Sequence, residues 1–284
     1  MRLTLNEEIT EGVDEVLAWA SIFNHHMKVD DLLHNLRVKS SLNELILAIE
    51  QSPHLSIEGN VVLSHKYPKN ENFDHSQKLA SQHLEETKHV LSILKSCKSI
   101  TGLAVTGSVA AGMNAEGGDV DVLIITKPGW VWRTRALAIF LSHRHPKGRL
   151  LCPNMVMSED ALKFEKSVYS AREMMQILPV KDIGGLTELS ARNEWTSEFL
   201  PNATRKNRML LPQIKEYPWW WRVMNIPILG RFIESWEASR RIKELTRSSK
   251  SSESIYSKSV CRGHENAHKT RIEERYNHVI EAIQ

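Results

Sequence analysis

The 284-residue sequence lacks an apolar run long enough to cross a bilayer. Its most apolar stretch, residues 219–229, contains Arg222, Asn225 and Pro227 and is shorter than the about 20 residues that a transmembrane helix needs. The first residues turn acidic at Glu7 and contain no apolar core of a secretory signal. We therefore expect no membrane partner and no export by that route.

Cysteine is scarce, and the three thiols lie far apart in the chain at Cys97, Cys152 and Cys261. This odd number and wide spacing predict neither a disulfide framework nor a C-x-x-C metal site. A reducing compartment, the cytoplasm, is the expected location.

No excess of charge of one sign is present, because 37 Lys and Arg face 34 Asp and Glu, a net charge of +3. This balance neither demands nor excludes nucleic acid as a partner. A hydrophobic content of 41% excludes the disordered and fibrous classes, and the length predicts about two domains.

The N-terminal part has the periodicity of three helices, over residues 7–23, 29–36 and 42–50, followed by a hairpin over residues 55–63. This order resembles a winged-helix domain, which we assign to residues 1–68. The segment after it, rich in Lys, Asn and Pro, is typical of a linker.

The third of these helices bears on whether this domain reads DNA. Ser41 with Glu44 predicts a capping box at its start, and the helix carries Glu44 and Glu50 but no Lys or Arg. Helices that read DNA normally bring cations to the phosphates. We therefore favour a packing or dimerisation module, a candidate for pairing two chains, over a DNA-binding one.

The middle of the chain predicts a mixed α/β core over residues 69–160. A helix over residues 76–97 and another over residues 130–143 alternate with apolar strand candidates at residues 100–106, 120–126 and 149–157.

After this core the patterns are helical, over residues 161–165, 171–178, 186–199 and 230–245, and predict a helical subdomain over residues 161–247. A Ser-rich segment at residues 248–259 is typical of a flexible linker. With a terminal helix at residues 266–283 it makes up the last unit, residues 248–284.

One motif carries chemistry. Gly107 and Ser108 end the first core strand, ten residues follow, and Asp119-Val-Asp121 opens the second strand. Alternate residues of a strand share a face, so the two carboxylates would lie close together and would require a cation. Mg²⁺ prefers carboxylate and phosphate oxygens, and Gly107 and Ser108 at a helix start could receive a triphosphate.

The Gly-Ser, ten-residue gap and Asp-x-Asp motif resembles the DNA polymerase β-like nucleotidyltransferase superfamily. The resemblance implies an α/β (α+β) core with a mixed sheet, Mg²⁺ on Asp119 and Asp121, and an NTP, expected to be ATP, held at Gly107 and Ser108. It also implies transfer of a nucleoside monophosphate to an acceptor with release of pyrophosphate.

The superfamily usually adds a third carboxylate from a later strand, and the sequence departs from this pattern. Residues 150–158 contain no Asp or Glu, so Asn154 is the first candidate for that position, with Glu159 and Asp160 just beyond. An asparagine can coordinate a cation but cannot act as a base. The base must come from elsewhere, or the activity is impaired.

Looser resemblance links the chain to bacterial proteins in which such a domain follows a winged-helix-like segment. It rests on residues 121–135, 152–154, 169–173, 193–195 and 200–202. This resemblance indicates the reaction class and leaves the acceptor open between a protein, an RNA and a small alcohol or amine.

For two other features of the sequence, a structural role is favoured over a binding role. A basic group at Arg133, Arg135, Arg144, Lys147 and Arg149 could hold phosphates, but a solvated helix face is favoured. Residues 219–221 are three tryptophans, for which core packing or an oligomer contact is favoured over base stacking or membrane anchoring. The alternative to an enzyme is a winged-helix regulator whose degenerate domain senses NTP without turnover.

Overall fold

The first described residues form three helices and a small sheet. The structure is a computed structural model that describes residues 4–67, 72–249, 253–263 and 268–281. The helices and strands of this part are α1 (Leu5–Ile22), β1 (Met27–Lys28), α2 (Val29–Asn35), α3 (Leu42–Gln51), β2 (Leu55–Glu58) and β3 (Val61–Ser64). Their sheet is antiparallel with the order β1-β3-β2. The three predicted helices and the hairpin are present, and strand β1 was not predicted.

Capping boxes define where two of these helices begin. Ser41 accepts a hydrogen bond from the Glu44 amide, and the Glu44 carboxylate accepts one from the Ser41 amide, as the sequence predicts. Thr4 and Glu7 form the same reciprocal pair before α1. The assignment of this part as a winged-helix domain stays a prediction, as do the domain boundaries.

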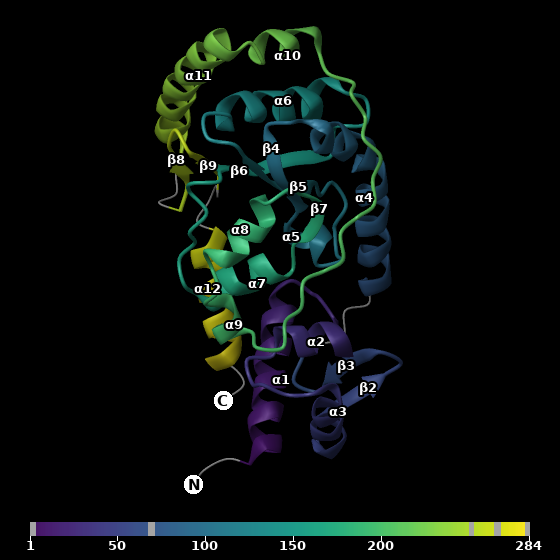
Figure 1. The fold of residues 1–284 in the computed structure, drawn as a ribbon. Helices are drawn as coiled ribbons and strands as arrows, with labels where there is room; N and C mark the ends of the chain where they lie inside the picture. Colours follow the sequence, from purple (N-terminus) through teal and green to yellow (C-terminus); the bar gives the residue numbers. More distant parts are fainter. Residues whose placement is uncertain (1–3, 68–71, 250–252, 264–267, 282–284) are drawn as a thin grey trace.

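A six-stranded mixed sheet forms the centre of the molecule (Figure 1). Its order is β7-β4-β5-β6-β9-β8; β5 and β6 run parallel, and all other neighbours are antiparallel. The strands are β4 (Ile100–Val105), β5 (Val120–Thr126), β6 (Leu151–Ser158), β7 (Leu178–Asp182), β8 (Ile255–Tyr256) and β9 (Val260–Arg262). This sheet confirms the predicted mixed α/β class.

Both faces of the sheet are covered, which explains why its central strands are mostly apolar. Leu103 and Val122 face a core shared with α4 (Phe73–Ser96) and α6 (Val131–Arg144). Ala104 and Leu123, on the opposite face, pack with Leu186 of α8 (Gly185–Ala191).

The C-terminal half departs from the prediction in three places. Residues 161–165 are not helical, residues 178–182 form β7 of the sheet rather than the end of a helix, and residues 186–199 are divided into α8 and α9 (Thr196–Phe199). Leu162 of this irregular segment nevertheless lies in the core, because a segment without helix or strand can also bury an apolar side chain. The predicted helix at residues 171–178 is displaced to α7 (Val168–Met175).

The Ser-rich segment is not a linker over its whole length. Residues 255–262 form the hairpin β8–β9, which adds to the sheet beside β6, whereas residues 250–252 of the predicted linker lie outside the described residues. The expected linker after the first domain also falls partly outside them, at residues 68–71.

Three further helices complete the fold: α10 (Trp219–Met224), α11 (Pro227–Ser248) and α12 (His268–Glu281). The last lies against α1, where the rings of Tyr276 and Trp19 meet edge to face. Across the described ranges, no helix is both long and apolar enough to traverse a bilayer.

The members of the basic group do not share one environment, and neither do the tryptophans of residues 219–221. Arg133 is buried and paired with Glu234 of α11, so the predicted solvated face is wrong for this residue. Among the tryptophans, Trp221 is buried in the core, whereas Trp219 is exposed.

Candidate functional site

The two aspartates of the motif meet at the start of β5. Val120 between them is fully buried, so the side chains of Asp119 and Asp121 lie on the other side of the strand. Their carboxylate oxygens and the Sγ of Cys152 all lie within 4.8 Å of one another. The structure therefore brings together the two carboxylates that the sequence predicts.

The electrostatics of this pair are unfavourable without a cation. Burial, followed by the neighbouring charge of Asp119, raises the pKa of Asp121 to about 6. Burial and both carboxylates also raise the pKa of the Cys152 thiol, which therefore stays protonated. A bound cation would reverse this penalty on Asp121.

Gly107 fits the space left by Asp121. Its φ is +63°, in the left-handed region, and a Cβ there would lie 2.7 Å from the Asp121 Oδ2. The Thr106 amide donates to the carbonyl oxygen of Asp121 over 2.9 Å, which joins β4 to β5 at this point. The sequence predicts a glycine at which a phosphate can approach the backbone; in the structure, the neighbour that excludes a side chain is Asp121.

Ser108 lies in the one-turn helix α5 (Gly107–Ala110), directly after this glycine. Its hydroxyl donates to the Oδ1 of Asn114 over 3.5 Å. The amides of a helical first turn have no partner within the helix, so they are available to an anion.

Asn114 organises the ten-residue gap, and the motif spacing did not reveal it. This buried residue donates from Nδ2 to the Asp119 carbonyl over 3.2 Å and to His83 Nδ1 over 2.8 Å. Its own backbone exchanges hydrogen bonds with Ser76 of α4. The loop that carries Asp119 is therefore held on α4.

Two residues of β6, Cys152 and Asn154, lie where the third site position was predicted. Cys152 is directly opposite Asp121 in the parallel pairing, and the register then shifts before Met155. Asn154 falls in this irregularity and lines the same cavity as Asp121. Strand β6 itself contains no carboxylate.

The cavity has a volume of about 520 Å³ and lies between α1 and α2 on one side and the central sheet on the other. Gly107, Ser108, Asp121 and Asn154 all line it, whereas Asp119 is exposed. Four of the five predicted site residues therefore share one cavity.

Glu173 of α7 supplies a carboxylate to this cavity from outside the sheet. Burial, followed by the charge of Asp121, raises its pKa to about 7. The only signal for it in the sequence was its place in the segment 169–173 of the looser resemblance.

Two cations also line the cavity, and both have protein partners. Arg172 forms an ion pair with Glu15 over 3.3 Å and lies 4.6 Å from the Trp19 ring. Lys206 donates to the Ala110 carbonyl over 2.5 Å, and burial lowers its pKa.

Residues 87–151 match the family model of the nucleotidyltransferase domain. The matched segment runs from α4 to the first residue of β6 and contains both halves of the motif. It confirms the resemblance to the DNA polymerase β-like superfamily, while Asn154 and Glu173 lie beyond it. Neither the curated proteins nor the solved structures hold a significant match to this chain.

Proposed function

We propose that this nucleotidyltransferase domain moves a nucleoside monophosphate from an NTP, with ATP as the expected donor, to an acceptor and releases pyrophosphate. The observation that carries the proposal is the meeting of Asp119 and Asp121 beside the Gly107–Ser108 turn, within the matched segment.

The donor atoms fit Mg²⁺. Two carboxylates at alternate positions at the start of one strand offer the hard oxygen ligands that Mg²⁺ prefers. The thiol of Cys152 is a soft donor with a raised pKa, so we assign the cation to Asp119 and Asp121. Bound there, the cation would supply neutralisation of the charge that develops on the phosphates.

The other roles follow from position. Ser108 and the first-turn amides of α5 would bind the triphosphate, and Lys206, which reaches the Ala110 carbonyl of the same helix, would add a positive charge beside it. Glu173, with its pKa near neutrality, is suited to accept the proton of an attacking hydroxyl or amine. Asn154 would orient the substrate, because an amide cannot take up that proton.

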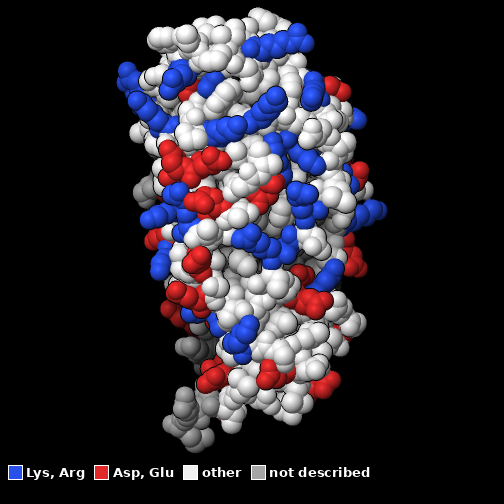
Figure 2. Space-filling model, in the orientation of Figure 1, with Lys and Arg blue, Asp and Glu red and all other residues white. Residues whose placement is uncertain are grey.

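For the acceptor, the cavity favours a small alcohol or amine, or a single side chain presented by a protein, over a long RNA. Figure 2 shows Lys and Arg interspersed with Asp and Glu over the face drawn, where a nucleic acid backbone would need a continuous basic track. The acidic α3 likewise does not support DNA binding by the first domain. Pairing of two chains through residues 1–68 and a cytoplasmic location stay predictions.

A second candidate function is a sensor that binds NTP without turnover. The absence of a carboxylate from strand β6 favours it. Glu173 favours the enzyme, because it provides a carboxylate to the cavity from α7.

The experiment is label transfer. The chain is incubated with Mg²⁺, each α-labelled NTP in turn and a lysate of its host, with an Asp119→Asn, Asp121→Asn double variant as the control. Label in protein, RNA or a small molecule that is absent with the variant supports the enzyme and identifies the acceptor class. Binding of NTP without label favours the sensor, and no binding of NTP refutes both.

A further inference from the structure

A long irregular segment runs along one side of the molecule from α9 to α10 (Figure 1). We name this segment, residues 201–218, the strap; residues 203–218 contain no helix or strand. Near its start Asn202 donates to the Val38 carbonyl over 2.7 Å, and Lys206 then reaches Ala110 beside the cavity. The strap thus connects the first domain, the cavity wall and the far end of the central core.

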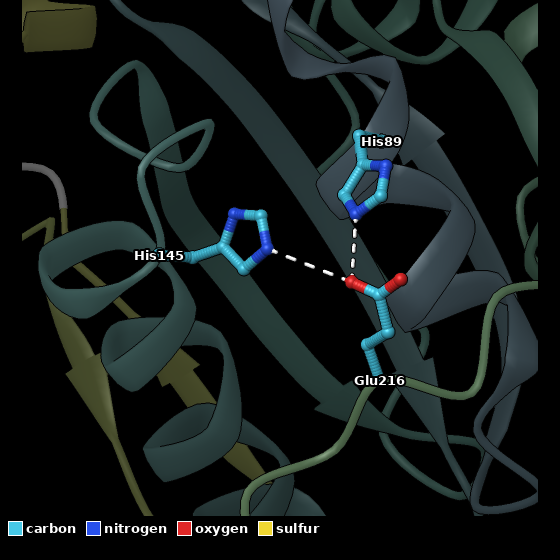
Figure 3. Close-up of side chains that lie close together, drawn as sticks. All are labelled: His89, His145 and Glu216. Atoms are coloured by element: carbon cyan, nitrogen blue, oxygen red, sulfur yellow. Dashed lines mark hydrogen bonds and ion pairs between the residues drawn. The ribbon is translucent and has the colours of Figure 1, made fainter.

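Near its C-terminal end the strap meets two histidines (Figure 3). His89 comes from α4, His145 follows the last residue of α6, and Glu216 belongs to the strap. The Glu216 Oε2 lies 3.0 Å from the His89 Nε2 and 3.9 Å from the His145 Nε2, and all three ligand atoms lie within 4.8 Å of one another. Both imidazoles point their Nε2 atoms at the same carboxylate oxygen.

We propose that His89, His145 and Glu216 form a binding site for a divalent transition-metal cation, Zn²⁺ by preference, which fastens the strap to α4 and α6. This site is separate from Asp119 and Asp121 and does not depend on the proposed function.

The distances are close to those of a tetrahedral site. Zn–N and Zn–O bonds of 2.0–2.1 Å place neighbouring ligand atoms about 3.3–3.4 Å apart. The two observed separations of 3.0 and 3.9 Å bracket this value, and all three ligand atoms lie within 4.8 Å of one another, so adjustment of the side chains would bring them to this spacing. Because Glu216 is 60% exposed, water can complete the coordination.

The chemistry of the donors favours Zn²⁺ over Mg²⁺. Two imidazoles and one carboxylate are typical ligands of zinc, whereas Mg²⁺ requires oxygen ligands. The two rings lie 5.1 Å apart at 25°, with side chains that are only 20–25% exposed. Burial, followed by the neighbouring His89, lowers the pKa of His145.

Metal binding would exchange one hydrogen bond. The Nδ1 of His145 accepts from the Lys147 amide over 3.1 Å, so binding through Nε2 requires a change of tautomer. The amide lies at an exposed position and can bond to water instead. Without a metal, the three side chains form only an ion-pair and hydrogen-bond cluster.

The test is a Co²⁺ titration of the full chain after chelator treatment, followed by displacement with Zn²⁺. We expect absorption bands of tetrahedral Co²⁺ with no thiolate charge-transfer band, and we expect them to persist in Cys152→Ser, which excludes the Asp119–Asp121–Cys152 group. Zinc at about 100 times its Kd should raise the unfolding midpoint by about 5–10 °C.

His145→Ala should weaken the metal at least about 100-fold and abolish the thermal shift. His143→Ala is the matched control, because His143 lies two positions away, is exposed and bonds only within α6. Glu216→Gln, on the exposed strap, gives the same test if the histidine variant does not fold. Bands that disappear in Cys152→Ser, or equal affinity in His145→Ala, Glu216→Gln and His143→Ala, would overturn the proposal.

Discussion

Substitution of Gly107 by alanine isolates the close approach on which the candidate site is built. The new Cβ would meet the Asp121 Oδ2 at 2.7 Å, closer than such atoms approach, so the carboxylate must move. The backbone at φ +63° adds strain, because a left-handed conformation costs a residue with a Cβ about 1–2 kcal/mol.

Gly112 provides the control for that strain. It lies in the same loop with φ +84°, but a Cβ there would have nothing within 4 Å. Gly112→Ala and Gly107→Ala should therefore lose similar stability from the backbone, about 1 kcal/mol after the smaller entropy of the unfolded alanine chain is subtracted. This corresponds to a fall of about 2–4 °C in the unfolding midpoint.

The two variants should separate in function. Displacing a ligand carboxylate by about 1 Å typically costs about 100-fold in activity, so Gly107→Ala should lose Mg²⁺-dependent NTP binding or label transfer by that order. Gly112→Ala should stay within a few-fold of the parent chain. Calorimetric titration of NTP with and without Mg²⁺ and thermal unfolding of both variants make the comparison. Equal functional loss in both variants, or full function in Gly107→Ala, would refute the reasoning.

Three further predictions concern carboxylates. The pKa of Asp121 is raised from 3.8 to about 6, so the stabilisation of the fold by the neutral carboxyl is present below about pH 4 and is lost as the pH rises through 6. Asp121→Asn should therefore add about 1–2 kcal/mol to the free energy of unfolding at pH 8 and little at pH 4. The same substitution should abolish Mg²⁺-dependent NTP binding. Glu173→Gln should retain NTP binding in calorimetry but lose turnover in label transfer, and loss of both would argue against its role as a base. The buried Glu234 accepts from the Trp132 and Arg133 amides and from the Arg133 guanidinium, so Glu234→Ala should cost about 3–5 kcal/mol in denaturant unfolding, against less than about 1 kcal/mol for the exposed Glu244→Ala.

The sequence predicts the elements whose signals are local. Val120–Thr126 is apolar and buried except at Asp121 and Thr126, of which Thr126 is also buried, and β5 has the predicted bounds. The capping box at Ser41 and Glu44 marks the start of α3. In both places short-range patterning and tertiary packing agree.

Elements that form only by pairing with distant segments of the chain leave no such local signal. Strand β7 is five residues long, contains Pro179 and fully buries only Val180, so its pairing with β4 leaves little pattern in the sequence. The hairpin β8–β9 begins within a Ser-rich segment whose composition predicts flexibility, yet it pairs with β6.

The same distinction separates the site residues. Gly107, Ser108, Asp119 and Asp121 lie on one strand–turn–strand unit, whose spacing alone brings them together. Glu173 reaches the cavity from α7, and no spacing rule connects it to Asp121. Strand β6 contains no carboxylate, and the residues of that strand give no indication that one enters the cavity from α7.

The contacts of Arg172 and Lys206 support the interpretation of Asp121 as a metal ligand rather than as one member of a structural ion pair. Arg172 lines the same cavity, but Glu15 and the Trp19 ring hold it, and Lys206 reaches the Ala110 carbonyl. The charge of Asp121 is therefore raised in energy by burial and by Asp119, with neither of these two cations paired to it. A fold selected for stability alone would gain by pairing or neutralising this carboxylate. An unneutralised pair beside the Gly107 turn is instead what a site that must bind an external cation with its nucleotide requires.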